Sequence, residues 1–297
     1  MTKLLVFAIF SFFVVVGETE ASETINPKTY VFKKVNSVEL KADVYSPSSG
    51  TKQPPVIVYL HGGALIFGDR HGQPKSPLLE KLLDSGFAVV SVDYRLAPRT
   101  KANEIVEDVE DACKWIRKEG PQLFGVNPNK LIVMGGSAGG YLTLALGHRL
   151  SLPPQALVSI SGYGDLLWLN KARVKEVPNT IPPYEGKGGY DFYQYTRMYG
   201  VWIKEVTGLD PNSDSEKLMK LCPIENITNT YPATMLIHSE GDSDVPYEQA
   251  VKMKQALDIH EIDCEFVTVP QGHSSQLIKI NPEVIDEMIA FLKRIIR

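Results

Sequence analysis

Cysteine is scarce in this chain of 297 residues, which contains only Cys113, Cys222 and Cys264. Three cysteines allow at most one disulfide bond, so a disulfide framework is excluded and a hydrophobic core must hold the fold. Cys113 falls on the apolar face of a predicted helix and is expected to be a buried thiol. Cys222 and Cys264 are then the candidates for a single disulfide bond.

Clustered positive charge is also missing. The formal net charge is −4 and the lysines and arginines form no run, which argues against a nucleic-acid partner because phosphate binding needs grouped cations. With 43% hydrophobic and 22% charged residues, the composition is that of a globular domain.

No apolar run reaches the roughly 20 residues that span a bilayer. The longest candidate, residues 4–16 (LLVFAIFSFFVVV), follows Lys3 and precedes a small-x-small segment that ends at Ala21. This layout is typical of a secretory signal peptide. It predicts a signal peptide over residues 1–21 and a secreted protein with no stable membrane anchor. Asn226 lies in an Asn-x-Thr sequon and is either glycosylated or an unmodified loop residue.

Strand-like and helix-like segments alternate along residues 22–297, which we interpret as one domain. Two segments, 30–34 and 38–45, look like an antiparallel pair. Apolar strands are predicted at 55–60, 87–92, 131–134, 156–160, 234–238 and 265–269. Helices are predicted at 77–83, 105–116 (ended by Gly120 and Pro121), 137–148, 247–257 and 282–296. This alternation predicts an α/β fold with a mostly parallel sheet and helices on both faces.

One segment interrupts the alternation. Residues 163–222 are rich in tyrosine, tryptophan, glycine and proline, and they follow the end of a predicted strand. Ligands of parallel sheets bind beyond the carboxyl ends of the strands. We therefore expect this insertion to be a partly helical lid over the binding edge of the sheet, although an insertion that serves only packing would show the same composition.

The segment 135–139 (GGSAG) fits the pattern Gly-x-Ser-x-Gly between a predicted strand and a predicted helix. A nucleophile elbow needs this strand–turn–helix setting, because its backbone is strained and its hydroxyl must be exposed. The segment has neither the Gly-x-Gly-x-x-Gly pattern nor the Walker lysine of a nucleotide-binding turn. The motif therefore predicts Ser137 as a nucleophile.

A serine nucleophile needs a base and a carboxylate that orients the base. Of the six histidines, His273 follows the last predicted strand in a loop that can reach the elbow. Asp242 lies in the loop after the preceding strand, with Asp244 and Asp165 as competitors, and any of them could merely cap a helix. The order Ser137, Asp242, His273 is the order that α/β-hydrolases use.

Backbone N–H groups must stabilise the oxyanion that forms when a nucleophile attacks a carbonyl. The segment 61–64 (HGGA) directly follows a predicted strand, where such donors are expected. We assign the donors to Gly63 and Ala64, together with the N–H of Ala138 after the nucleophile.

Together these motifs resemble the hormone-sensitive-lipase-like branch of the α/β-hydrolase superfamily. The matching segments are HGGALIFG at 61–68, SVDYRLAP at 91–98, GGSAGG at 135–140, IHSEGDSDVP at 237–246 and GH at 272–273. The resemblance implies an α/β-hydrolase fold and an esterase that acts on short or medium acyl groups without cofactor or metal. It also implies the same roles for Ser137, Asp242, His273 and the three oxyanion donors.

The sequence departs from that branch at three points. Gly136 stands where an aspartate is usual, Ala64 replaces the usual third glycine, and the long N-terminal helical cap is missing. The lid would then come from residues 163–222. A serine peptidase of the prolyl-oligopeptidase type and a non-catalytic binding protein on the same fold are the alternatives to an esterase with a small-molecule ester substrate.

Overall fold

The computed structural model describes residues 26–47, 50–72, 77–174 and 180–297, so the predicted signal peptide lies outside the described residues. Within these ranges one sheet has the order β1-β2-β4-β3-β5-β6-β7-β8. Its strands are β1 (Lys28–Val35), β2 (Val38–Tyr45), β3 (Val56–Leu60), β4 (Ala88–Val92), β5 (Leu131–Gly136), β6 (Ala156–Ile160), β7 (Ala233–Ser239) and β8 (Cys264–Val269).

The sheet is parallel from β4 to β8, whereas β2 pairs antiparallel with both β1 and β4. Strands β3, β4, β5 and β6 are buried along their whole length. Alternate residues therefore enter different cores: Val56 and Val58 pack on one face, Ile57 and Tyr59 on the other. An apolar run without polar alternation is what a strand covered on both faces requires.

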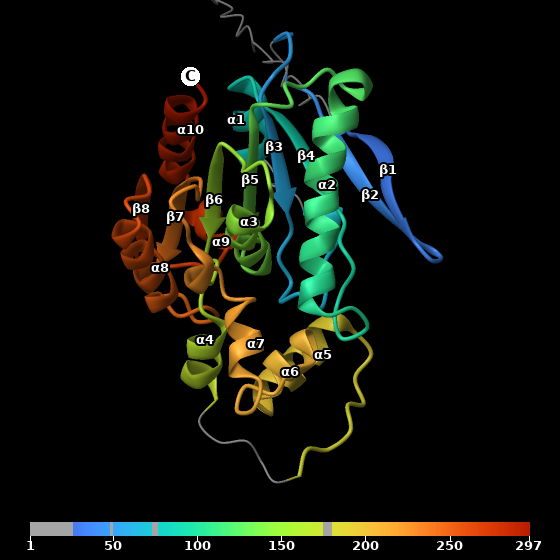
Figure 1. Ribbon diagram of the computed structural model, residues 1–297, viewed down its shortest axis with the longest axis vertical. Coiled ribbons are helices and arrows are strands. Elements are labelled where there is room, and N and C mark those ends of the chain that lie inside the picture. The colour runs from blue at the N-terminus through green and yellow to red at the C-terminus, as the bar shows by residue number, and fades with distance from the viewer. Residues whose placement is uncertain (1–25, 48–49, 73–76, 175–179) are drawn as a thin grey trace, which may run out of the picture.

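Ten α-helices surround the described part of the sheet (Figure 1). They are α1 (Leu78–Asp84), α2 (Ala102–Leu123), α3 (Ala138–Arg149), α4 (Leu166–Arg173), α5 (Gly189–Met198), α6 (Trp202–Thr207), α7 (Ser215–Met219), α8 (Glu248–Ile259), α9 (Ser275–Ile280) and α10 (Glu283–Ile295). No helix within the described ranges combines the length and the apolar character needed to cross a membrane.

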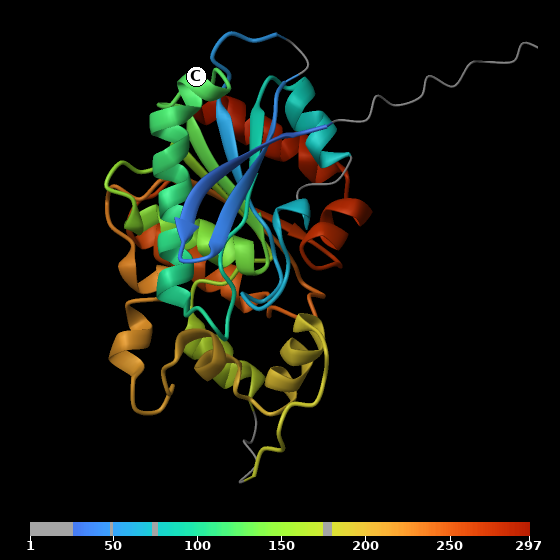
Figure 2. The same ribbon diagram turned by 90° about the vertical axis from the view of Figure 1, so that its right-hand side faces the viewer.

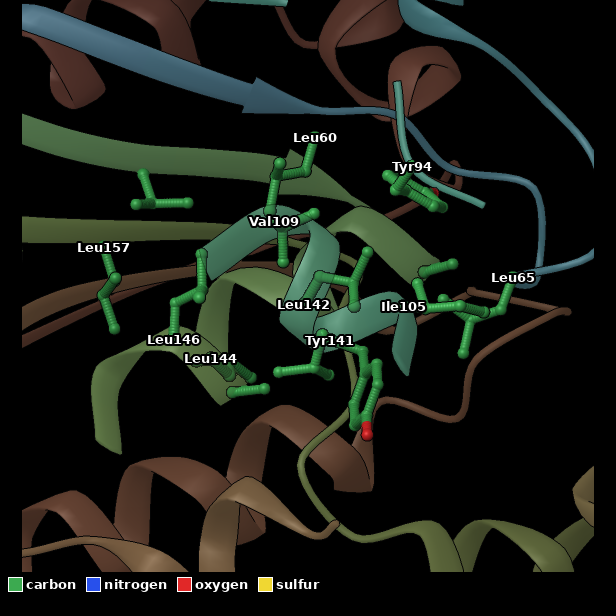
Figure 3. Close-up of a cluster of buried hydrophobic side chains, with 14 of the residues drawn as sticks. Leu60, Leu65, Tyr94, Ile105, Val109, Tyr141, Leu142, Leu144, Leu146 and Leu157 are labelled. Carbon is green, nitrogen blue, oxygen red and sulfur yellow. The ribbon is translucent and has the colours of Figure 1, made fainter. Parts of the chain in front are cut away.

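Helices α2, α3 and α8 supply apolar residues to one core, and α1, α9 and α10 supply them to the other. Figure 3 shows the first core, where Ile105 and Val109 of α2 and Leu142 of α3 meet Leu60 of β3. The predicted α/β fold with helices on both faces is thus confirmed.

Two predicted details of the secondary structure were wrong. Helix α2 does not end at Gly120 and Pro121 but continues to Leu123, and the N–H of Phe124 still bonds to the carbonyl of Gly120. A proline in the last turn removes only one intrahelical hydrogen bond, so the helix ends shortly after it rather than at it. Helix α9 was not predicted, because its six residues show no clear apolar periodicity.

The cysteines and the sequon have local structural explanations. All three cysteines are free thiols, so Cys222 and Cys264 form no disulfide bond. The Cys222 sulfur instead accepts the N–H of Leu166 at 3.3 Å. Asn226 donates its side-chain nitrogen to the carbonyls of Met219 and Cys222 at 3.0 and 2.8 Å. A glycan on that nitrogen would replace one of these bonds.

The insertion, residues 163–222, carries helices α4 to α7, with residues 175–179 outside the described ranges. Figures 1 and 2 show these helices together at one end of the sheet, opposite the end near the C-terminus. Trp202 and Tyr163 are nearly fully buried and join the core that α2 and α3 form. The insertion is therefore packed onto the sheet domain.

Candidate active site

The nucleophile motif forms a sharp turn between β5 and α3. Ser137 has φ 56° and ψ −119°, a conformation that is uncommon for a residue with a side chain. Its N–H bonds to Ile160 in the next strand at 2.8 Å, and its carbonyl accepts the first helical bond from Tyr141 at 3.0 Å. A Cβ at Gly139 would lie 2.0 Å from the carbonyl oxygen of Leu60. The turn can thus approach β3 only with glycine there.

His273 and Asp242 meet although 31 residues separate them. The distance from His273 Nδ1 to Asp242 Oδ2 is 2.7 Å. The other carboxylate oxygen of Asp242 accepts the N–H groups of Asp244 and Val245, both at 2.9 Å. Burial opposes ionisation of Asp242, but the bonds from His273 and from these two amides outweigh burial and lower its pKa. The Asp242 side chain is fully buried, and it accepts hydrogen bonds as an ionised carboxylate.

The competing carboxylates make other contacts. Asp165 accepts the N–H of Trp168 at 2.8 Å and caps α4. Asp244 accepts the hydroxyl of Tyr193 at 2.6 Å and a hydrogen bond from Arg197, both from α5. Its second oxygen lies 3.5 Å from Nε2 of His273. Asp242 orients the imidazole at Nδ1, and Asp244 connects the site to the insertion.

Two of the other histidines, His238 and His61, are buried near the site. His238 is buried, with Nε2 3.0 Å from the carbonyl oxygen of Val245 and 3.5 Å from Asp242 Oδ2, and burial lowers its pKa. His61 stacks on Tyr94 with ring centroids 4.0 Å apart, and burial lowers its pKa too. His238 contacts the loop that carries Asp242, and His61 lines the cavity beside Ser137.

The segment 61–64 curls over the elbow. Gly63 and Ala64 have φ values of 110° and 56°, and both line the same cavity as Ser137 and His273. Ala138 is fully buried at the start of α3. No bond from the amide of Gly63 or Ala64 to another part of the described chain is present. Gly63 and Ala64 therefore line the cavity with amides that no backbone carbonyl of the described chain accepts.

Gly62 is a cavity residue that the sequence analysis did not assign. A Cβ there would lie 3.4 Å from Ser137 Cβ and 3.1 Å from the Gly136 carbonyl oxygen. The glycine thus keeps the approach to the hydroxyl open. The sequence signals were its adjacency to Gly63 and its place in the segment HGGALIFG at 61–68.

The cavity above Ser137 has a volume of about 600 Å³. One side consists of residues from the loops at the sheet edge, and the other of Tyr190, Tyr193, Gln194 and Arg197 from α5. Tyr190 packs edge-to-face on Phe67 with ring centroids 5.8 Å apart and is 58% exposed. The sequence predicted an aromatic insertion here but not which of its side chains line the cavity.

The insertion also contacts the loop of the expected oxyanion donors. Trp202 of α6 donates its indole N–H to the carbonyl of Ala64 at 3.1 Å, and Tyr163 packs edge-to-face on Trp202. A hydrogen bond to a carbonyl oxygen restricts rotation of its peptide group. The contact from Trp202 therefore restricts the backbone around Ala64.

The sheet order and the strand-end site define the chain as an α/β-hydrolase. The chain belongs to the BD-FAE family, whose sequence model matches residues 42–257. It is 32% identical to the esterase LipU of Mycobacterium tuberculosis over 207 residues, which cover 68% of this chain and 63% of LipU. It is 31% identical to the carboxylesterase/phospholipase LipF of the same organism, covering 63% of this chain and 46% of LipF.

These esterase relatives support the predicted enzyme class, a carboxylic ester hydrolase. A longer match is to the non-reducing polyketide synthase stbA of Stachybotrys bisbyi, 27% identical over 77% of this chain. The chain spans only 13% of that synthase.

Solved structures agree with the fold. A truncated carbohydrate esterase from gut microbiota superposes with a TM-score of 0.71 at 17% identity, covering 93% of this chain and 98% of that one. An acetyl ester-xyloside bifunctional hydrolase from Caldicellulosiruptor lactoaceticus gives 0.72 at 20% identity, covering 92% and 98%. Butyrate-bound Est2 of Thermogutta terrifontis, an esterase, gives 0.66 at 23% identity, covering 91% and 95%.

Proposed function

We propose that this protein is a serine carboxylesterase in which Ser137 is the nucleophile, His273 the general base and Asp242 the carboxylate that orients the base. One observation carries the proposal: His273 bonds to the buried Asp242 through Nδ1 at 2.7 Å and lines the same cavity as Ser137. With Nδ1 engaged, Nε2 is the nitrogen left for the serine hydroxyl.

Acyl transfer would proceed in two steps. Ser137 Oγ attacks the ester carbonyl carbon while His273 Nε2 accepts the hydroxyl proton, and the alcohol leaves after receiving that proton. Water then attacks the acyl-enzyme while His273 Nε2 takes its proton, and the bond from the acyl carbon to Ser137 Oγ breaks as Oγ receives that proton, which releases the carboxylic acid. Asp242 stays ionised throughout, because its lowered pKa keeps the proton on the imidazole.

The amides of Gly63, Ala64 and Ala138 are the proposed donors to the oxyanion. Two of them lie in the segment 61–64, where Gly63 and Ala64 have positive φ values and line the cavity. Donors fixed by the backbone need no reorganisation when charge develops on the carbonyl oxygen.

The proposed substrates are esters of short or medium carboxylic acids. The side of the cavity formed by α5 includes the polar residues Tyr193, Gln194 and Arg197, of which Tyr193 and Arg197 bond to Asp244. These groups suit a hydroxylated alcohol portion better than a long alkyl chain. Structural neighbours that are named as a carbohydrate esterase and an acetyl ester-xyloside hydrolase support this substrate class.

Secretion is part of the proposal and rests on the leader at residues 1–21. The experiment is to express the full chain in a secreting host and sequence the N-terminus of the protein in the medium. A mature chain that begins at Ser22 is expected. Retention of the full-length chain inside the cell would contradict secretion without touching the esterase proposal.

Labelling with a fluorophosphonate and turnover of p-nitrophenyl acetate test the activity. The wild type should label at Ser137, whereas Ser137→Ala should neither label nor retain kcat, with an expected loss of about 10⁴-fold or more. An unlabelled wild type would favour a binding protein on this fold. Faster cleavage of peptide amides than of esters would favour a peptidase.

A further inference from the structure

Two serines that are not among the expected site residues, Ser161 and Ser274, lie next to the site in unusual backbone conformations. Ser161 follows β6, is fully buried and has φ 51°. Ser274 follows His273 and has φ 51° and ψ −121°, close to the values of Ser137. Residues with side chains adopt such angles only where the surroundings hold them, and such positions cluster at functional sites.

Hydrogen bonds continue the parallel sheet past the ends of its strands. The N–H of Ser137 bonds to Ile160 of β6, and the N–H of Ser161 bonds to Ile237 of β7, both at 2.8 Å. The residues that follow β5 and β6 are therefore fixed in register with each other. This places the Ser161 side chain at the level of the elbow.

The Ser161 hydroxyl uses that placement to bind the histidine loop. Its oxygen accepts the N–H of Ser274 at 3.0 Å, across 113 residues of sequence. Ser274 is the neighbour of His273 in the chain. The loop after β8 is thus bonded directly to the strand beside the nucleophile.

Ser274 also contacts the elbow through its side chain. A Cβ built on Gly136 would lie 2.2 Å from Ser274 Oγ and 3.4 Å from Ser274 Cβ. The hydroxyl therefore fills the space where residue 136 would carry a side chain. Residue 136 is a glycine here, whereas the hormone-sensitive-lipase-like branch usually has an aspartate. Ser274 occupies the space that a larger residue at 136 would need.

We propose that Ser161 and Ser274 are positioning residues that set His273 at its working distance from Ser137. The proposal rests on the proposed function. One contact fixes the backbone of the histidine loop, and the other fixes its approach to the residue before the nucleophile. A base misplaced by about 1 Å costs about 100-fold in rate, so two such contacts are enough to matter.

The first test removes the hydrogen bond. In Ser161→Ala, we expect kcat and the fluorophosphonate labelling rate to fall together by about ten- to hundredfold with little change in KM. Ser159→Ala is the matched control, because Ser159 is a buried serine of β6, two residues before Ser161, but donates its hydroxyl to the carbonyl of Gly140 in α3 at 3.2 Å. Ser159→Ala should lower Tm by as much as Ser161→Ala does, but its labelling rate should stay within about twofold of that of the wild type.

The second test reverses the steric contact. Gly136→Ala should lower kcat by displacing Ser274, and Gly136→Asp should lower it further. Adding Ser274→Ala to Gly136→Ala should restore the rate to that of Ser274→Ala alone, because the remaining 3.4 Å separation is an ordinary contact. Gly188→Ala, where a Cβ would lie 3.8 Å from its nearest neighbour, controls for replacing a glycine.

The outcomes separate the two proposals. A wild type that does not label would contradict the esterase proposal itself. A wild type that labels, with Ser161→Ala and Gly136→Ala labelling equally fast, would overturn the positioning role alone. If Gly136→Ala unfolds, the double variant decides: recovery of both Tm and labelling rate supports the role, and recovery of Tm alone overturns it.

Discussion

The loops at the carboxyl edge of the sheet and the insertion at residues 163–222 form opposite sides of one cavity, but they are built differently. At the sheet edge, backbone hydrogen bonds and positive φ values hold the residues, as at Ser137 and Ser161. In the insertion, side chains make the contacts: Tyr193 and Arg197 reach Asp244, and Trp202 reaches Ala64.

This difference indicates that the two regions have different roles, one in the reaction and the other in substrate selection. Backbone hydrogen bonds survive most changes of side chain, so the sheet edge can keep its geometry except where a position such as Gly139 or Ser161 is replaced. Side-chain contacts can change by single substitutions, so the insertion can change which alcohol or acyl group fits. The two neighbouring carboxylates lie where the two regions meet: Asp242 bonds to His273 at the sheet edge, and Asp244 bonds to α5 of the insertion.

The largest expected effect distinguishes these carboxylates. Asp242→Asn should lower kcat on p-nitrophenyl acetate by about 10³- to 10⁴-fold, because an amide no longer stabilises the imidazole in the correct tautomer. Asp244→Asn should lower it by about tenfold or less, because Asp244 contacts the insertion rather than Nδ1. Steady-state kinetics of the two variants measure this ratio, and equal losses would contradict the assignment of the acid.

An intermediate effect is expected on the insertion side. Arg197→Gln and Tyr193→Phe each remove a bond to Asp244. We expect KM for an acetylated sugar to rise about three- to tenfold while kcat for p-nitrophenyl acetate changes little. Tyr195→Phe is the control, since that hydroxyl on the same helix bonds to Pro182 at 2.7 Å instead. A fall in kcat on both substrates would mean that the insertion also positions the reacting groups.

The smallest expected effect concerns the dependence of stability on pH in the sheet domain. Burial lowers the pKa of His148 from its ordinary 6.5 to about 4, with a smaller contribution from the Arg149 charge. Between these values the unfolded chain binds a proton that the folded chain does not, so stability falls as pH decreases from 6.5 toward 4.

His148→Gln should reduce that loss of stability. Thermal unfolding at pH 7 and pH 5 measures it, and the difference in Tm between the two pH values should shrink by about 2 °C. His260→Gln, an exposed position at the end of α8, is the control and should leave the difference unchanged. An unchanged difference in both variants would mean that other groups carry the acid sensitivity.

Local patterns in the sequence determined the fold class and most strand and helix positions. The runs at Val56–Leu60 and Ala156–Ile160 were recognisable because strands buried on both faces are apolar throughout. The elbow at Ser137 and the loop at Gly63 were recognisable because tight turns and close approaches restrict residue type. These are constraints that act over a few residues, so the amino-acid string displays them directly.

Only the tertiary structure decided which carboxylate bonds to Nδ1 of His273, how α5 reaches Asp244, and that Ser161 bonds to the loop after β8. Asp242 and Asp244 are two residues apart with the same chemistry, and each would satisfy a local rule. Their environments differ because one points into the packed loop and the other toward α5. Contacts across 31 to 113 residues depend on how the whole sheet is assembled, and no local pattern encodes that assembly.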